Sequence, residues 1–281
     1  MSLLSVFNWR LTIREGLLAN PALKGRELKE YYFDSDFWLK QGDLKQAKDS
    51  KLNSLIADLK DGDFLVVSDD EASTVVLPQV PSTIPTLVIG INDFSTSPAW
   101  DQFCSAVKKH AVLFEDYPYK KALELAQKRF PSVSRITAIG GDTPTSKSII
   151  SGLRQFISTT KLTLVETAAS RDWTTWRTKL QSWDNPNTLT WVFVPYGVRD
   201  SLNEEISPHA MLEWINSHVH NSRAGAYALK GGLDVTIGLD PKEFGAEAGS
   251  LAEAMLSNKT LKCRNPSRSY RVALGKRKVS K

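Results

Sequence analysis

The sequence has few cysteines. Its 281 residues include two, Cys104 and Cys263, which are far apart and form neither a CxxC pair nor a metal-ligand spacing. This excludes a zinc ribbon and a disulfide-rich scaffold. Two cysteines permit at most one disulfide, and the sequence leaves open whether they pair.

Long apolar runs and a secretory leader are missing as well. No run of about 18 apolar residues occurs, so no membrane span is predicted. The first residues lack the charged start, apolar stretch and cleavage site of a signal peptide. Because the chain starts inside a predicted strand, we expect that a leader has been removed from it.

Catalytic signatures are also absent. The sequence contains no GxSxG, HExxH or GxGxxG motif and no pair of CxxC motifs. The stretch from Gly140 to Lys147 is not a phosphate-binding P-loop, because Ser146 stands where that motif needs glycine. No catalytic residue, metal or cofactor is therefore predicted.

Positive charge is present but local. The net charge is +5, and much of the excess lies near the end of the chain, at Lys276, Arg277, Lys278 and Lys281. A short basic terminus is usually a solvated end, and no basic helix interleaved with aromatic residues occurs elsewhere. A nucleic-acid partner is not predicted.

Short β-branched or aromatic runs alternate with amphipathic segments along almost the whole chain. This alternation is typical of βαβ units around parallel sheets, and several runs are almost wholly apolar, as buried parallel strands are. We therefore predict an α/β fold with two parallel sheets. The predicted strands are residues 3–7, 28–33, 64–67, 86–91, 135–139, 162–167, 189–194, 224–228 and 270–274.

Apolar residues three and four positions apart mark the helices between these strands. The clearest helix covers Pro241–Leu256, where Asp240 is the predicted N-cap and Glu243 completes a capping box. Another helical stripe is assigned to the core rather than to a ligand site, and it consists of Trp173, Trp176, Leu180 and Trp183.

No Gly/Ser-rich linker or internal repeat divides the chain. Two lobes must therefore be joined by short crossings, which we place near residues 112–118, 233–240 and 261–266. The predicted first lobe is residues 1–114 plus about 236–262, and the second is residues 115–235 plus about 263–281.

In an open α/β sheet, ligands bind beyond the carboxyl ends of the strands. The residues that follow the predicted strands are polar and aromatic, and they are the candidate ligand-binding residues. In the first lobe they are Phe7, Asn8, Trp9, Asp69, Asp70 and Asn92, and in the second lobe Thr143, Thr145, Ser146, Tyr196 and Arg199.

The segment Gly140–Ser146 runs from a strand into a helix and presents hydroxyl and backbone N–H groups at the start of that helix. Such a site favours an anionic group, for example a carboxylate. The alternative is that Thr145 or Ser146 only caps the helix.

Arg199 lies on a strand-end loop just after Tyr196. This position suits a bidentate grip on a carboxylate. The alternative is a surface salt bridge with Asp200 or Glu204.

Three carboxylates in a row, Asp69, Asp70 and Glu71, form another candidate. Clustered carboxylates can hold a cation or share a proton, but adjacent residues point in different directions. We prefer the binding of a ligand ammonium group to a metal site. One of the three is expected to cap the helix that runs toward Leu77.

Read together, the strand-end loops resemble a known family. The matching stretches are SDDEA (residues 68–72), GIN (90–92), RITAIGGDTPTS (135–146), VRD (198–200) and DPKEFGAEAG (240–249). In this order they are similar to the substrate-binding proteins of ABC transporters in the group of tryptophan and tyrosine binders. They also resemble the sensing domains of bacterial sensor kinases.

The resemblance implies a type I periplasmic-binding fold, in which two Rossmann-like lobes joined by three crossings close on a ligand. It also implies an extracytoplasmic location and a membrane permease or a sensor kinase as partner. The stretch after Asn92 and the loop at Tyr227–Gly231 depart from the family pattern.

The leading hypothesis is therefore binding of a small polar ligand, such as an amino acid, in an interlobe cleft for ABC transport. The same fold can serve as the input domain of a two-component sensor kinase. Another hypothesis is an α/β enzyme that acts on a nucleotide or sugar through Asp69 and Asp70. A last one is an interaction module whose cleft no longer binds small molecules.

Overall fold

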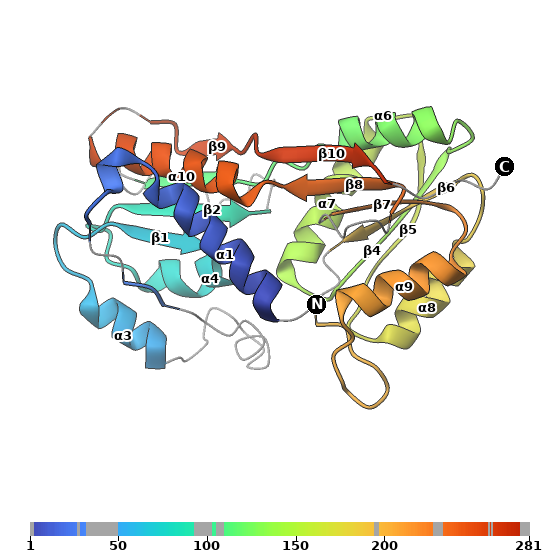
Figure 1. The fold of residues 1–281 in the computed structure, drawn as a ribbon, viewed down its shortest axis with the longest axis horizontal. Coiled ribbons are helices and arrows are strands. Elements are labelled where there is room, and N and C mark those ends of the chain that lie inside the picture. The colour runs from blue at the N-terminus through green and yellow to red at the C-terminus, as the bar shows by residue number, and fades with distance from the viewer. Residues whose placement is uncertain are drawn as a thin grey trace. The chain divides into compact units, whose positions relative to one another are not determined.

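The computed structural model divides the chain into two compact units (Figure 1). Unit 1 consists of residues 1–5, 117–240 and 270–281, and unit 2 consists of residues 6–116 and 241–269. The structure describes residues 3–26, 29–31, 50–92, 103–104, 110–193, 197–226, 233–257, 259 and 261–275.

Unit 2 contains a parallel sheet with the strand order β1-β2-β3-β9 among its described residues. The strands are β1 (Leu65–Ser68), β2 (Thr86–Ile91), β3 (His110–Phe114) and β9 (Arg264–Pro266). All of β2 is buried, because it pairs with a strand on each side and its sequence is almost wholly apolar. The strands predicted at residues 64–67 and 86–91 are thus present.

The helices described in unit 2 are α1 (Leu3–Leu18), α3 (Ser50–Asp58), α4 (Asp70–Val76) and α10 (Pro241–Leu256), with short 3-10 turns η1 (Pro21–Leu23) and η3 (Leu77–Gln79). Helix α10 has the predicted bounds and packs on β2 and β3. Leu52 and Leu55 of α3 form a buried apolar cluster with residues of β1.

Helices α1 and α10 approach each other so closely that their contact requires glycine. A Cβ atom on Gly245 would lie 2.1 Å from the carbonyl oxygen of Ile13, and one on Gly16 would lie 2.3 Å from that of Lys242. Ile13 and Leu17, one turn apart, are buried. The strand predicted at residues 3–7 is therefore wrong: this short apolar run is the beginning of a helix that continues to Leu18.

A disulfide joins Cys104 to Cys263 within unit 2, with 5.6 Å between the Cα atoms. Cys263 directly precedes β9, and its carbonyl oxygen accepts a hydrogen bond from the backbone N–H of Val112 in β3 (2.6 Å). The bond ties the segment before β3 to the start of β9. It also answers the pairing question that the sequence left open.

Unit 1 contains a mixed sheet with the order β10-β8-β7-β6-β4-β5 among its described residues. Only β10 runs antiparallel to its neighbour. The strands are β4 (Arg135–Gly140), β5 (Thr163–Ala169), β6 (Thr188–Phe193), β7 (Ser222–Ala226), β8 (Val235–Leu239) and β10 (Tyr270–Leu274).

The helices described in unit 1 are α6 (Tyr119–Arg129), α7 (Pro144–Ser158), α8 (Trp173–Ser182) and α9 (Pro208–His218). The apolar stripe of α8 is buried together with Trp183, Met211 and Ile215 in one core cluster. The assignment of these tryptophans to the core is confirmed.

Three strands lie where the sequence analysis places crossings. Residues 110–114 form β3, residues 235–239 form β8 and residues 264–266 form β9. Each was missed because it is short and lies beside the points where the chain changes units, which follow residues 116, 240 and 269. Of the strand predicted at 28–33, the structure describes residues 29–31, and they form no strand.

No helix within the described residues is both long and apolar enough to cross a membrane.

Candidate ligand-binding site

Asp69 follows β1 and caps helix α4, and its carboxylate accepts a hydrogen bond from the backbone N–H of Asp70 (2.8 Å). Its backbone has φ 89° and ψ 156°, a region that residues other than glycine rarely adopt. The side chain is exposed. The prediction that one of the three carboxylates caps this helix is confirmed. Backbone strain such as that of Asp69 is often found at functional sites.

Asp70 and Asn92 hold the ends of β1 and β2 together. The carboxylate of Asp70 accepts hydrogen bonds from the backbone N–H of Asn92 (3.0 Å) and from its side-chain amide (3.1 Å). Both side chains are buried. The Oδ1 atom of Asn92 has no hydrogen-bond partner among the described residues, and an N–H group of a ligand can satisfy such an acceptor.

Two further carboxylates follow β3. The backbone N–H of Glu115 donates to the carbonyl of Ile91 (2.8 Å), and the Glu115 side chain is buried beside Gly90, which forms a bulge in β2 with φ 73°. Asp116 is exposed, yet desolvation by the surrounding protein raises the pKa of its carboxyl group. Neither residue is predicted from the sequence, because β3 itself is not predicted.

The carboxyl end of the unit 2 sheet carries charges of both signs, because the exposed Arg268 follows β9, which runs parallel to β3. Carboxylates follow β1 and β3, and the described residues directly after these strands include no lysine or arginine. Among the described residues no group of three or more His, Cys, Asp or Glu side chains could hold a metal ion. Because Asn92 occupies the carboxylate of Asp70, we do not assign Asp69 and Asp70 as an acid–base pair.

In unit 1 the loop after β4 leads into helix α7. Thr143 is the N-cap, and its hydroxyl oxygen accepts a hydrogen bond from the backbone N–H of Ser146 (3.1 Å). The alternative that Thr145 or Ser146 caps this helix is therefore wrong. Capping needs an extended residue just before the first turn, and Thr143 is extended whereas the other two lie inside the helix.

The three predicted hydroxyls of this loop differ in exposure. Thr143 is half-buried, Thr145 is buried and Ser146 is fully buried. The hydroxyl of Ser146 lies against Gly140 and has no hydrogen-bond partner among the described residues. Asp142 next to the cap forms an exposed ion pair with Lys147 (2.6 Å).

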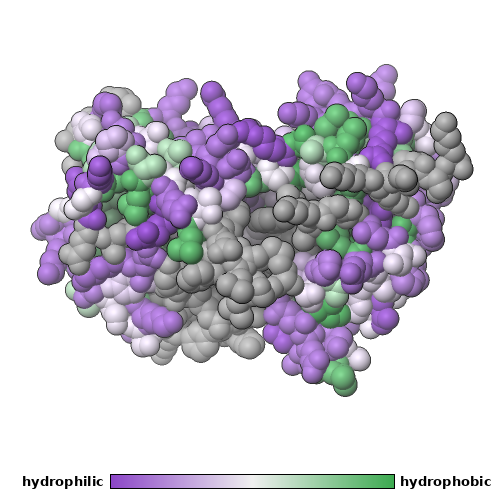
Figure 2. All heavy atoms as spheres, in the orientation of Figure 1, coloured by the Kyte–Doolittle hydropathy of each residue, from purple (hydrophilic) through white to green (hydrophobic). Residues whose placement is uncertain are grey.

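Arg199 lies in a tight loop between β6 and α9. Its guanidinium donates to the carbonyl oxygen of Asn203 (2.9 Å), and its backbone pairs with Asp172 and Glu205. This contact differs from the salt bridge with Asp200 or Glu204 considered above. At the tip of the loop Leu202 is 78% exposed. Figure 2 shows one face of the molecule, on which hydrophilic atoms predominate among the coloured residues.

The structure does not confirm a strand-end position for the remaining predicted ligand-binding residues. Phe7, Asn8 and Trp9 lie in helix α1, so they do not follow a strand, and their side chains are outside the described part of the structure. Tyr196 also lies outside the described residues.

No protein-family model matches the chain, and no curated protein matches its sequence. Solved structures do match its fold. A conserved domain protein from Vibrio cholerae O1 biovar El Tor has a TM-score of 0.63 and 15% identity, and the match covers 96% of this chain and 88% of that chain.

Two other similar structures are of proteins that are described by the ligands they bind. A Streptococcus pneumoniae ABC domain in complex with L-Trp has a TM-score of 0.61 at 14% identity and covers 95% of this chain and 88% of its own. GanP, a glucose-galactose binding protein from Geobacillus stearothermophilus, has a TM-score of 0.62 at 14% identity and covers 95% and 92%.

The chain therefore has the type I periplasmic-binding fold that is found in solute-binding proteins of ABC transporters. The fold implied by the sequence resemblance is confirmed.

Proposed function

We propose that this protein binds a small polar ligand outside the cytoplasm and delivers it to an ABC-type membrane permease, without changing the ligand chemically. The fold supports this role, because proteins that share it bind L-Trp or glucose and galactose. Under this proposal, polar residues at the strand ends of each unit are the candidates for contacting the ligand.

The charges at the strand ends favour an α-amino acid. In unit 2 the exposed carboxylate of Asp69 suits an ammonium group. In unit 1 the N-terminus of α7, with the Thr143 hydroxyl beside it, suits a carboxylate. A neutral sugar needs neither charge, so we prefer an amino acid to a sugar.

The observation that carries this proposal is the exposed carboxylate of Asp69. Its backbone strain costs on the order of 1–3 kcal/mol, and the fold maintains it at the carboxyl end of a strand. A helix cap alone does not require that strain, because ordinary N-caps have extended backbone with negative φ, as Thr143 has.

The disulfide supports the proposed location. Disulfides form and persist in oxidising compartments outside the cytoplasm and are rare in reducing ones. Periplasmic or extracellular protein should therefore lack free thiols when alkylated without reduction.

The test is a titration of the protein with a panel of amino acids, sugars and nucleotides, read by calorimetry and by thermal shift. We expect an amino acid to raise the melting temperature and to be recovered unchanged. Asp69→Asn keeps the capping oxygen but removes the charge, so affinity should fall about 10- to 100-fold while the ligand-free melting temperature stays the same.

Asp61→Asn is the matched control, because Asp61 is exposed on the loop before β1 and should not alter affinity. The proposal fails if no member of the panel stabilises the protein, or if Asp69→Asn binds as tightly as the unchanged protein. A chemically altered ligand would point to the enzyme hypothesis instead.

Arg199 remains part of the proposed site. Arg199→Ala should weaken ligand binding without unfolding the protein, because the loop keeps its backbone pairing with Asp172 and Glu205. An unchanged dissociation constant would remove Arg199 from the site.

A further inference from the structure

The chain passes between the two units at three points, which follow residues 116, 240 and 269. We call these points the first, second and third crossings. The segments beside them are far apart in the sequence, yet within each unit they are bound to one another. Ser267 makes this connection in unit 2, and Tyr270 makes it in unit 1.

In unit 2 the buried residue Ser267 contacts a segment beside each of the other two crossings. Its backbone N–H donates to the carbonyl oxygen of Phe114 (2.8 Å), which ends β3 shortly before the first crossing. Its hydroxyl donates to the carboxylate of Glu247 (2.7 Å) in α10, the helix that begins directly after the second crossing. Since Ser267 itself lies just before the third crossing, one residue joins all three segments.

Glu247 holds the segment before the third crossing through two donors. Besides the hydroxyl of Ser267, its carboxylate accepts a hydrogen bond from the backbone N–H of Arg268 (3.0 Å). The hydroxyl oxygen of Ser267 in turn accepts one from the backbone N–H of Ser269 (3.2 Å). Helix α10 packs on β2 and β3, so the position of the carboxylate is fixed. Because hydrogen bonds to an ionised group are roughly twice as strong as neutral ones, the loss of this contact should be measurable.

In unit 1 Tyr270 has the corresponding position, because it begins β10 directly after the third crossing. Its backbone pairs with Leu239, the last residue of β8, which lies just before the second crossing. Its ring packs on the ring of Tyr117, the first residue of unit 1 after the first crossing, with 4.9 Å between the ring centroids. Tyr117 is buried. Tyr270 therefore joins segments beside the same three crossings within unit 1.

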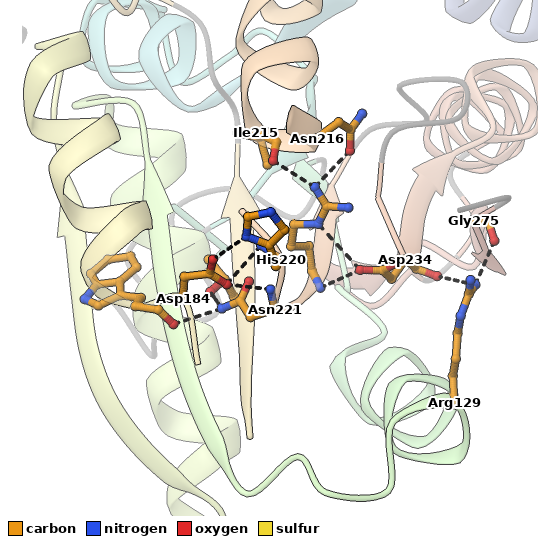
Figure 3. A network of polar contacts seen from close by, with 11 residues as sticks. Arg129, Asp184, Ile215, Asn216, His220, Asn221, Asp234 and Gly275 are labelled. Carbon is orange, nitrogen blue, oxygen red and sulfur yellow. Dashed lines mark hydrogen bonds and ion pairs between the residues drawn. The ribbon is translucent and has the colours of Figure 1, made fainter. Parts of the chain in front are cut away.

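The opposite ends of β8 and β10 are bound together as well (Figure 3). The backbone N–H of Gly275 donates to the carbonyl oxygen of Asp234 (2.8 Å), and the guanidinium of Arg129 donates to the carbonyl oxygen of Gly275 (2.7 Å). The buried carboxylate of Asp234 lies 3.5 Å from the buried guanidinium of Arg223. Because β8 and β10 are held at both ends, they should respond to a displacement of Tyr270 as one body.

We propose that Ser267 and Tyr270 couple the three crossings, so that a movement of the chain at one crossing displaces the other two. The fold implies movement about the crossings, but it does not determine which side chains join them. In this chain a hydrogen bond to a carboxylate does so in unit 2 and an aromatic pair does so in unit 1. The inference needs no ligand and does not depend on the proposed function.

The test is hydrogen–deuterium exchange of the full, oxidised chain, read by mass spectrometry in peptides that cover residues 112–118, 239–246 and 266–271. Segments that open as one cooperative unit exchange together, so a bond lost at one crossing should accelerate exchange at all three. Ser267→Ala removes the hydroxyl and should raise exchange in the three peptides about 5- to 10-fold. Glu247→Gln, which cannot accept both donors, and Tyr270→Leu, which removes the ring contact, should act in the same direction. Glu253→Gln is the control, because it removes the same charge from α10 but binds Asn20 (3.0 Å) and not a crossing.

The expected result is that the three peptides change together in each of these variants and stay unchanged in the control. Faster exchange confined to residues 266–271 in Ser267→Ala would overturn the proposal, because the other two crossings would then move independently. Equal changes in Glu253→Gln would overturn it as well. So would an increase of the same size in β6 (Thr188–Phe193), since that would show a general loss of stability rather than coupling between the crossings.

Discussion

The contact between α1 and α10 allows a test in which two physical effects predict opposite signs. Gly245 lies inside α10, where alanine is intrinsically better by about 1 kcal/mol. Helix propensity alone therefore predicts that Gly245→Ala stabilises the protein. The packing of α1 predicts the reverse.

The distance between the new methyl group and its neighbour sets the size of the effect. The Cβ atom would lie 2.1 Å from the carbonyl oxygen of Ile13, so α1 must move by roughly 1 Å to restore an ordinary contact. Overpacking of this kind costs about 1–3 kcal/mol, and a backbone atom cannot rotate away as a side chain can. Because the clash is with a backbone atom, we take the upper end of this range, about 3 kcal/mol. After the gain of about 1 kcal/mol in propensity, the net loss is about 2 kcal/mol and the melting temperature should fall by about 4–8 °C.

Calorimetry or circular dichroism measures this change. Gly16→Ala, on the other helix, should act in the same direction, because its Cβ atom would lie 2.3 Å from the carbonyl oxygen of Lys242. Ser250→Ala on the exposed face of α10 is the control and should leave the melting temperature equal or slightly higher. A higher melting temperature for Gly245→Ala would refute the packing of α1 on α10.

Three further predictions concern polar groups. Asn92→Asp places a second carboxylate against the buried one that Asn92 now binds, and denaturant unfolding should show a loss of about 1–3 kcal/mol. Arg223→Met leaves Asp234 buried without its cation and should cost about 3–5 kcal/mol, whereas adding Asp234→Leu should recover much of that loss. Hydrogen bonds from Thr175 lower the pKa of Asp172 in the folded protein. The ionised Asp172 therefore stabilises the fold at pH values above its unfolded-state pKa of about 3.9, and this stabilisation is lost as the pH falls through its lower folded-state pKa. In an acid titration the unchanged protein should therefore lose stability relative to Asp172→Asn below pH of about 4, and parallel curves would contradict this.

The sequence predicts well those elements whose pattern is long or strongly apolar. The strands at 86–91 and 270–274 and the helix at 241–256 have the predicted bounds. Strand β9 has only three residues, Arg264–Pro266, and no apolar alternation, so pairing with β3 rather than local preference determines it. The run at 3–7 has the composition of a strand, but it continues into the helical repeat of Ile13 and Leu17.

The candidate site could be predicted only in part, for a similar reason. Asp69 caps the helix that it directly precedes, so a local pattern identifies its role, whereas the same kind of pattern misplaced the cap of α7 by two or three residues from Thr143. The contact of Asp70 with Asn92 joins residues that are 22 positions apart, and it depends on the register that pairs Ser68 with Ile89. No local pattern contains that register.

The disulfide has a consequence for how the chain responds to cleavage. Cys104 and Cys263 are 159 residues apart, and the segment between them includes residues 117–240, the main part of unit 1. The disulfide therefore closes a covalent loop that contains the main part of unit 1. A single peptide-bond cleavage anywhere in that loop releases no fragment. After limited proteolysis the nicked chain should migrate as one species without reductant and separate into two pieces when the bond is reduced. Unit 1 can thus be opened once and still remain attached to unit 2 at both ends.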